Sequence, residues 1–234
     1  MALKILDYQN QKFDLVYQLI NNNAQKNMVF LHGWGSNKEL MQMAFEGVFS
    51  DFNHYYIDLP GFGKSFNDCA LHTHDYAQIL RIFFAQLGFQ PDVIVGHSFG
   101  GKVAVLLDSE VILLSSAGIL EPKSFSVRLK IAIAKILKKL RLKGAFLRSK
   151  DANNLNEGMY QTFKNVVNED FSEIFASFKQ KATIFWGIDD KATSLASGQK
   201  ISSFIENSRF YPLVGDHYFF LKQGKEIQRL YSQD

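Results

Sequence analysis

This sequence of 234 residues has almost no cysteine, no long apolar run and no pattern typical of an export signal. Its single cysteine, Cys69, excludes a disulfide within the chain and is typical of a reducing compartment. The residues around Cys69 carry no motif that would activate a thiol, so we do not expect it to be a nucleophile. No stretch of about 18 apolar residues occurs, and Met1 to Leu15 lack a basic-then-apolar leader pattern. We therefore expect a cytoplasmic protein without a membrane-spanning helix.

Recognisable metal and nucleotide motifs are missing as well. His54, His72 and His74 lack partners at metal-ligand spacing, so no metal site is expected. The segment 63–65, Gly-Lys-Ser, matches the end of a phosphate-binding loop, but that loop needs a glycine where Asp58 stands. No nucleic-acid-binding motif accompanies the basic residues. We expect no cofactor and no nucleic-acid partner.

Short apolar strands alternate with helices along most of the chain. The pattern predicts strands over residues 3–8, 12–20, 28–31, 54–58, 93–95, 111–114, 181–186 and 210–214. It predicts helices over residues 38–49, 75–87, 101–107, 194–205 and 219–231. Such alternation indicates the α/β class, with a doubly wound and mostly parallel sheet.

The alternation breaks once, between Ala117 and about Gln180. This stretch reads as helical and is too long for a plain crossover between strands. We interpret residues 118–170 as a helical lid or cap inserted into one domain. The core of that domain would then consist of residues 1–117 and 171–234.

The most informative segment is Gly96-His97-Ser98-Phe99-Gly100, which lies between a predicted strand and a predicted helix. A tight turn of the form Gly-x-Ser-x-Gly in this position holds the serine in strained geometry and lifts its hydroxyl above the sheet. A Cβ at either glycine would collide with the neighbouring strand or helix. Only twelve residues separate Ser98 from Val111, which limits the following helix to about two turns.

A serine hydroxyl needs a base, and the base needs an orienting acid, in the chain order Ser, Asp or Glu, His on a sheet of this kind. His217 is the only histidine after Ser98, and it follows a predicted strand. Asp189 and Asp190 follow the preceding strand and are the candidate acids. His97 precedes the serine at a position that varies without chemistry, so we expect it to be structural.

Taken in order, five segments of the chain resemble the signature segments of the α/β-hydrolase family of serine hydrolases. They are 32–35 (His-Gly-Trp-Gly), 58–65 (Asp-Leu-Pro-Gly-Phe-Gly-Lys-Ser), 96–101 (Gly-His-Ser-Phe-Gly-Gly), 186–190 (Trp-Gly-Ile-Asp-Asp) and 215–217 (Gly-Asp-His). The resemblance spans nearly the whole chain, and the lid stretch is its least diagnostic part. It implies the α/β-hydrolase fold.

The same resemblance implies a role for individual residues. Ser98 would be the nucleophile, His217 the general base and Asp190, third after the glycine of the Trp-Gly segment, the orienting acid. The oxyanion hole would use the backbone N–H groups of Trp34 and Phe99. The substrate pocket would be apolar, with Trp34, Phe99 and Phe62, together with lid side chains, as walls.

The implied activity is hydrolysis of a carboxylic ester or thioester through an acyl-enzyme, with a small-molecule ester as substrate. A carbon–carbon bond hydrolase acting on a dienoate from ring fission would use the same fold and triad. The segments 33–35 and 59–65 also resemble esterases that act on an acyl ester bound to a carrier protein. A silent binding protein with this fold is a further alternative, which the intact Ser98, Asp190 and His217 disfavour.

Positive charge gathers in residues 121–150, which hold ten lysines and arginines and one acid, Glu121. The net charge of the whole chain is only +3, so the remainder is negative. Apolar and basic residues of 125–140 fall on opposite faces of a predicted helix. This pattern fits the solvated face of a lid helix. Docking of an anionic lipid surface or of an acyl carrier protein are the alternatives.

Overall fold

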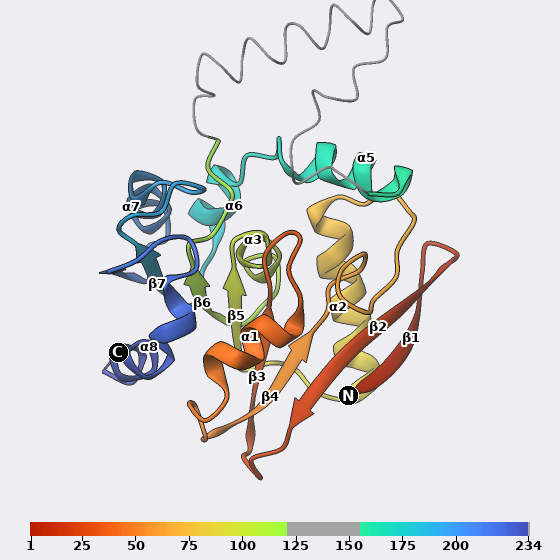
Figure 1. Ribbon diagram of the computed structural model, residues 1–234, viewed down its shortest axis with the longest axis horizontal. Coiled ribbons are helices and arrows are strands. Elements are labelled where there is room, and N and C mark those ends of the chain that lie inside the picture. Colours follow the sequence, from red (N-terminus) through yellow and green to blue (C-terminus); the bar gives the residue numbers. More distant parts are fainter. Residues whose placement is uncertain (121–154, 234) are drawn as a thin grey trace, which may run out of the picture.

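An eight-stranded sheet forms the centre of the described part of the chain, residues 1–120 and 155–233 of a computed structural model (Figure 1). The strand order is β1-β2-β4-β3-β5-β6-β7-β8, and the β1–β2 and β2–β4 pairs are antiparallel while the others are parallel. The strands are β1 (Ala2–Tyr8), β2 (Gln11–Ile20), β3 (Lys26–Leu31), β4 (Phe52–Ile57), β5 (Val93–His97), β6 (Glu110–Leu114), β7 (Ala182–Gly187) and β8 (Ser208–Leu213). The predicted mostly parallel α/β sheet is confirmed.

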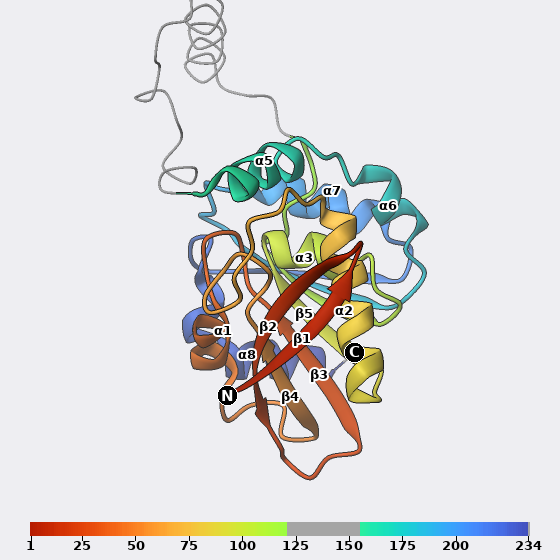
Figure 2. The same ribbon diagram turned by 90° about the vertical axis from the view of Figure 1, so that its right-hand side faces the viewer.

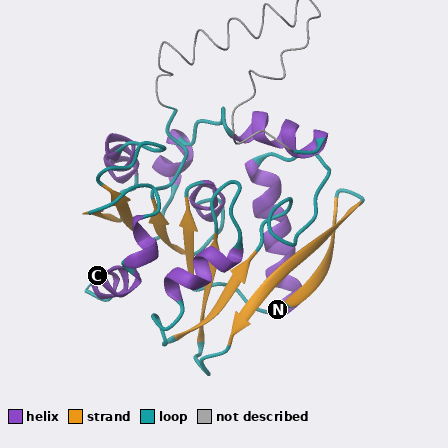
Figure 3. Cartoon of the chain, in the orientation of Figure 1, coloured by secondary structure: helices purple, strands orange, loops and turns teal. Residues whose placement is uncertain are grey.

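Helices cover both faces of this sheet (Figures 2 and 3). The described helices are α1 (Lys38–Phe45), α2 (Thr73–Leu87), α3 (Phe99–Ala104), α5 (Glu157–Val166), α6 (Ser172–Ser177), α7 (Leu195–Phe204), the 3₁₀ helix η3 (Phe219–Lys222) and α8 (Gly224–Tyr231). Buried residues of α1, η3 and α8 join one apolar cluster, and those of α2, α3, α5, α6 and α7 join the other. The sheet is therefore doubly wound.

The central strand β3 shows why the sheet needs cover on both sides. Met28 and Phe30 belong to the cluster under α1 and α8, whereas Val29 and Leu31 belong to the cluster under α2 and α3. All four side chains are fully buried. An uninterrupted apolar strand is what a parallel sheet covered by helices on both faces requires.

Three predicted helices end differently in the structure, and the one predicted over 101–107 spans Phe99–Ala104. The helix predicted over 38–49 stops at Phe45, because Glu46 is extended and Gly47 and Phe49 have φ angles of 83° and 55°. The helix predicted over 219–231 is divided at Gln223 into η3 and α8. A Cβ at Gly224 would lie 2.3 Å from the Ala44 carbonyl oxygen, so the chain bends where this glycine packs against α1.

Most of the predicted lid, 118–170, and all of the basic segment 121–150 lie outside the described residues. The described end of the predicted lid holds α5, which lies beyond the C-terminal ends of the parallel strands (Figure 1). Asn156 caps α5, since its side chain accepts a hydrogen bond from the Met159 N–H at 2.8 Å. In the described ranges, no helix has both the length and the apolar character needed to cross a bilayer.

Candidate active site

Ser98 occupies the sharp turn between β5 and α3. Its backbone has φ 50° and ψ −112°, a conformation that L-residues rarely adopt and that is held here by surrounding contacts. The Ser98 N–H donates to the Leu114 carbonyl at 3.0 Å, which ties the turn to β6. A Cβ at Gly96 would lie 2.6 Å from the Gly100 carbonyl oxygen, and one at Gly100 would lie 2.4 Å from that of Leu31. Both flanking glycines are thus required by close backbone approach.

Asp190 and His217 form a direct hydrogen bond, with Nδ1 of the imidazole 2.7 Å from Oδ2 of the carboxylate. Because a carboxylate only accepts, Nδ1 carries the proton and Nε2 is free to act as a base. The Asp190 side chain is fully buried, whereas its neighbour Asp189 is exposed. Of the two candidate acids, the structure pairs Asp190 with His217.

Further donors surround the Asp190 carboxylate besides His217, among them the Ser115 side chain. The Ala192 and Thr193 N–H groups donate to Oδ1 at 2.8 and 3.0 Å, and the Thr193 hydroxyl donates to Oδ2 at 2.9 Å. Burial by itself would raise the pKa of Asp190, but the hydrogen bonds from His217 and the Thr193 backbone outweigh it and hold this pKa well below its usual range. The acid is therefore a fixed carboxylate.

The topology brings these groups to one edge of the sheet. Asp190 follows β7 and His217 follows β8, and these neighbouring strands are parallel. The Asp189 N–H donates to the Gly215 carbonyl at 2.9 Å, which fastens the two loops together. Ser98 follows β5. All three residues therefore lie after the C-terminal ends of parallel strands, at the same edge of the sheet.

His97 joins the His217 loop to the turn that holds Ser98. Its Nε2 lies 3.0 Å from the His217 carbonyl oxygen, and the two imidazole centroids are 4.6 Å apart. His217 is thereby held beside the residue that directly precedes Ser98.

The loop that carries Trp34 is fixed by the buried His32. Its Nε2 accepts the Leu59 N–H at 3.0 Å, so Nδ1 carries the proton and donates to the Gly33 carbonyl at 2.8 Å. Burial lowers the pKa of His32 to about 4, which keeps the ring neutral in this role. The hydrogen bond between Leu59 and His32 therefore joins segments 32–35 and 58–65, two of the five sequence motifs.

An aromatic cluster surrounds Trp34. The ring centroids of Phe62, Phe99 and Phe163 lie 4.8, 5.6 and 5.4 Å from that of Trp34. Phe62 and Phe99 are only 7% and 4% exposed and pack against the partly exposed indole, and their place in a substrate pocket stays a prediction. Phe163 comes from α5 and extends this aromatic wall.

Sequence reasoning missed Thr193, Phe163 and the contact made by His97. Thr193 lies three residues after Asp190, a spacing that would have suggested a local hydroxyl-to-carboxylate bond. Phe163 carried no signal, because aromatic residues are frequent in this chain and most are core.

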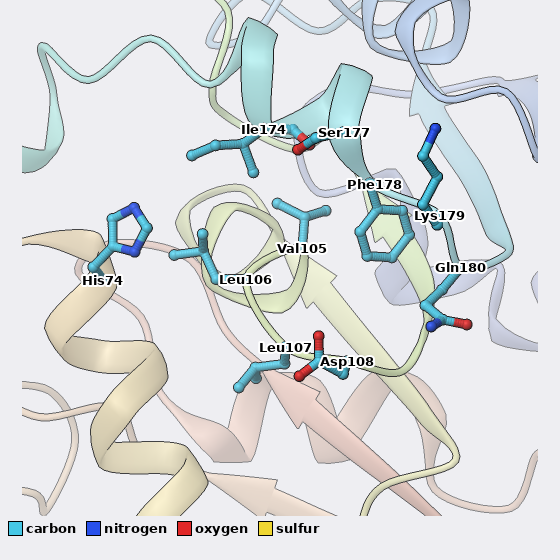
Figure 4. A pocket seen from close by; sticks show the side chains of 10 residues that line it. All are labelled: His74, Val105, Leu106, Leu107, Asp108, Ile174, Ser177, Phe178, Lys179 and Gln180. Atoms are coloured by element: carbon cyan, nitrogen blue, oxygen red, sulfur yellow. The ribbon is translucent and has the colours of Figure 1, made fainter.

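A hollow of about 400 Å³ lies at the opposite end of α3 from Ser98 (Figure 4). Val105, Leu106 and Phe178 are among its apolar lining residues, and His74 and Lys179 lie on opposite sides of it. None of the predicted site residues lines it. It is separate from the candidate active site.

A family model described as "Alpha/beta hydrolase family" matches residues 28–201, about three quarters of the chain. The chain belongs to the alpha/beta hydrolase family. The match begins in β3 and ends in α7, so it includes the turn of Ser98 and the loop of Asp190. The family resemblance drawn from the five motifs is confirmed, and the protein is a hydrolase by family.

Solved structures of similar fold support this assignment. A thermophilic esterase from Thermogutta terrifontis superposes with a TM-score of 0.77 at 14% identity, over 100% of this chain and 97% of that one. An enol-lactonase from Burkholderia xenovorans LB400 gives 0.74 at 16%, over 94% and 96%. A bromoperoxidase from Bacillus anthracis gives 0.75 at 17%, over 100% of both chains. At these identities the likeness shows that this alpha/beta hydrolase shares their fold.

Proposed function

We propose that this alpha/beta hydrolase is a serine hydrolase that cleaves a carboxylic ester or thioester through Ser98, His217 and Asp190. The observation that carries the proposal is the Asp190–His217 hydrogen bond, held beside the strained turn of Ser98. A nucleophile, a base with a free ring nitrogen and a buried orienting carboxylate are the parts that acyl transfer to serine needs. Among the similar structures, the esterase and the enol-lactonase are named for ester cleavage, which favours this bond type.

The proposed reaction has two halves. His217 Nε2 takes the proton of Ser98 as Oγ attacks the carbonyl carbon, and the imidazolium then returns that proton to the leaving alcohol or thiol. Water, deprotonated by His217, attacks the acyl-enzyme and releases the acid and the free serine. The backbone N–H groups of Trp34 and Phe99 are proposed to hold the oxyanion, where one donor contributes about 2.7–4 kcal/mol.

We propose an apolar, uncharged acyl group as the part of the substrate next to Trp34, because the wall there is aromatic. Residues 121–150 lie outside the described residues, and docking of an anionic lipid surface or an acyl carrier protein there is a proposal from their charge. We also propose that residues 1–117 and 171–234 form the core of the domain and that residues 118–170 form its lid.

Replacement of the nucleophile tests the proposal. Ser98→Ala should abolish turnover of p-nitrophenyl butyrate while the thermal midpoint stays close to that of the parent. Unchanged turnover would reject the triad. Assay of a ring-fission dienoate beside the butyrate ester separates the carbon–carbon bond hydrolase, which would prefer the dienoate.

A further inference from the structure

His97 is one of the most enclosed side chains of the site. It is 1% exposed, and its ring contacts those of His217, Tyr218 and Phe220 at centroid separations of 4.6, 5.3 and 4.7 Å. A histidine has two polar nitrogens that must be desolvated in such a place. Its burial beside the reacting groups therefore calls for a physical reason.

The hydrogen bond to His217 fixes the tautomer of His97. The His217 carbonyl oxygen only accepts, so His97 Nε2 carries the proton and donates it at 3.0 Å. His97 Nδ1 is buried without a hydrogen-bond partner in the described part of the structure. Burial lowers the pKa of His97 to about 3, so its ring is neutral. A neutral ring places no positive charge beside the imidazolium that the reaction forms on His217.

The other side of the His97 ring faces the loop that carries Trp34. A Cβ at Gly33 would lie 2.9 Å from His97 Nδ1 and 3.1 Å from the Ser98 Cβ. The Gly33 backbone therefore packs directly on the His97 ring. One side chain touches both the loop of the proposed base and the loop of a proposed oxyanion donor.

We propose that His97 is a positioning residue for the hydrolysis, which sets the spacing between His217 and the Gly33–Trp34 loop. The inference rests on the proposed function of Ser98 and His217. His217 is held at two points: Asp190 binds its ring and His97 binds its backbone carbonyl. Loss of the second point lets the His217 backbone move, and an error of about 1 Å in a reacting group lowers rates by about 100-fold.

Two substitutions separate the hydrogen bond from simple packing. His97→Gln places an amide Nε2 donor the same number of bonds from the backbone as the imidazole Nε2, whereas His97→Leu fills the site without a donor. We expect His97→Leu to lower kcat for p-nitrophenyl butyrate by about 10- to 100-fold with KM changed less than about twofold. His97→Gln should recover kcat to within about fivefold of the parent.

His54 offers a matched control in the same chain. It is 1% exposed, and its Nε2 lies 2.9 Å from the Phe49 carbonyl, at the start of β4 and away from the site. His54→Leu removes the same kind of buried bond, together with the contact between His54 Nδ1 and the Tyr56 hydroxyl at 3.0 Å. It should lower the thermal midpoint as His97→Leu does, without the loss of kcat.

The outcomes are distinct. Equal kcat in His97→Leu and the parent, or equal impairment of His97→Leu and His97→Gln in folded proteins, would overturn the proposal while Ser98→Ala still tests the triad. If the parent hydrolyses no ester, the proposed function fails. Nitrogen-15 spectra of labelled histidines then test the positioning contact directly. A neutral Nε2–H tautomer of His97 with a slowly exchanging proton supports it, and the opposite tautomer overturns it.

Discussion

Asp189 and Asp190 are adjacent carboxylates in opposite surroundings. The Asp190 side chain is fully buried and accepts hydrogen bonds from His217, Ala192 and Thr193. Asp189 is exposed, and its backbone N–H, rather than its side chain, joins the neighbouring loop. Position in the loop, and not residue type, decides which carboxylate can orient the imidazole.

Substitution of each aspartate by asparagine tests this difference. Asp190→Asn keeps the shape but offers His217 an amide that can impose the wrong tautomer, so kcat should fall by about three to four orders of magnitude. Asp189→Asn is the matched control and should stay within about twofold of the parent. Comparable loss in the two variants would contradict the assignment of the acid.

Thr193 supports Asp190 through its hydroxyl, which donates to Oδ2 at 2.9 Å. Thr193→Val removes this donor and keeps the shape, so kcat/KM should fall by about tenfold, the equivalent of one hydrogen bond of about 1.4 kcal/mol. Thr193→Ser retains a hydroxyl and should lie close to the parent. Steady-state kinetics on a p-nitrophenyl ester measures both, and a fall no greater for valine than for serine would refute the role.

Motifs that follow apolar strands predicted Ser98 and His217 and left Asp189 and Asp190 as candidate acids, of which the family resemblance selected Asp190. The sequence did not predict the contacts of His97 and Phe163. These depend on how loops distant in the chain meet, since His97 contacts a carbonyl 120 positions away. No local pattern encodes such a meeting.

At the scale of elements, a buried lysine joins α3 to the end of α5. Lys102 Nζ donates to the Val166 carbonyl at 2.7 Å and to Glu169 Oε2 at 2.9 Å, and Glu169 also accepts from the Thr73 hydroxyl at the start of α2. The Lys102 side chain is 3% exposed and that of Glu169 is 20%. The helix that follows Ser98 is thereby tied to the described end of the predicted lid.

The unequal exposure of this pair predicts unequal effects of breaking it. Glu169→Gln leaves the buried ammonium without its countercharge and should lower the free energy of unfolding by about 3 kcal/mol. Lys102→Met leaves a carboxylate that water can reach and should lower it by about 1 kcal/mol. Urea denaturation of both variants measures the order, and a larger effect of Lys102→Met would contradict this account.

Element types were predicted better than element ends. Apolar periodicity located every described strand to within a few residues. It could not show that the helix starting at Lys38 would end at Phe45, because that end depends on the positive φ angles of Gly47 and Phe49. The stretch between Ala117 and Gln180 was predicted to be helical, and α5 and α6 lie in its described part.

At the scale of the whole molecule, buried neutral histidines make stability depend on pH. Burial lowers the pKa of His32 to about 4 and that of His97 to about 3, and it lowers the pKa of His54 as well. The unfolded chain binds these protons near pH 6.5, so it holds more protons than the folded chain below that pH. The stabilising contribution is complete above about pH 6.5 and is lost as the pH falls through 4 toward 3.

The free energy of unfolding should therefore decrease by about 1.4 kcal/mol per pH unit for each of His32 and His97 as the pH falls from 6.5 to 4.5. Urea titrations at pH 7.5, 6.0 and 5.0 measure the slope. His97→Gln lacks one of these histidines, so its free energy of unfolding should fall less steeply with decreasing pH, by about 1.4 kcal/mol per pH unit. Equal stability at pH 7.5 and 5.0 would show that these rings are not neutral in the folded protein.

The central claim is that Ser98 is a nucleophile activated by His217, and covalent labelling tests it most directly. The protein is treated with a fluorophosphonate, and the modified peptide is identified by mass spectrometry. We predict a single adduct on Ser98, with labelling slowed by at least about 100-fold in His217→Ala. An adduct elsewhere, no adduct, or equal labelling of the His217→Ala variant would contradict the account.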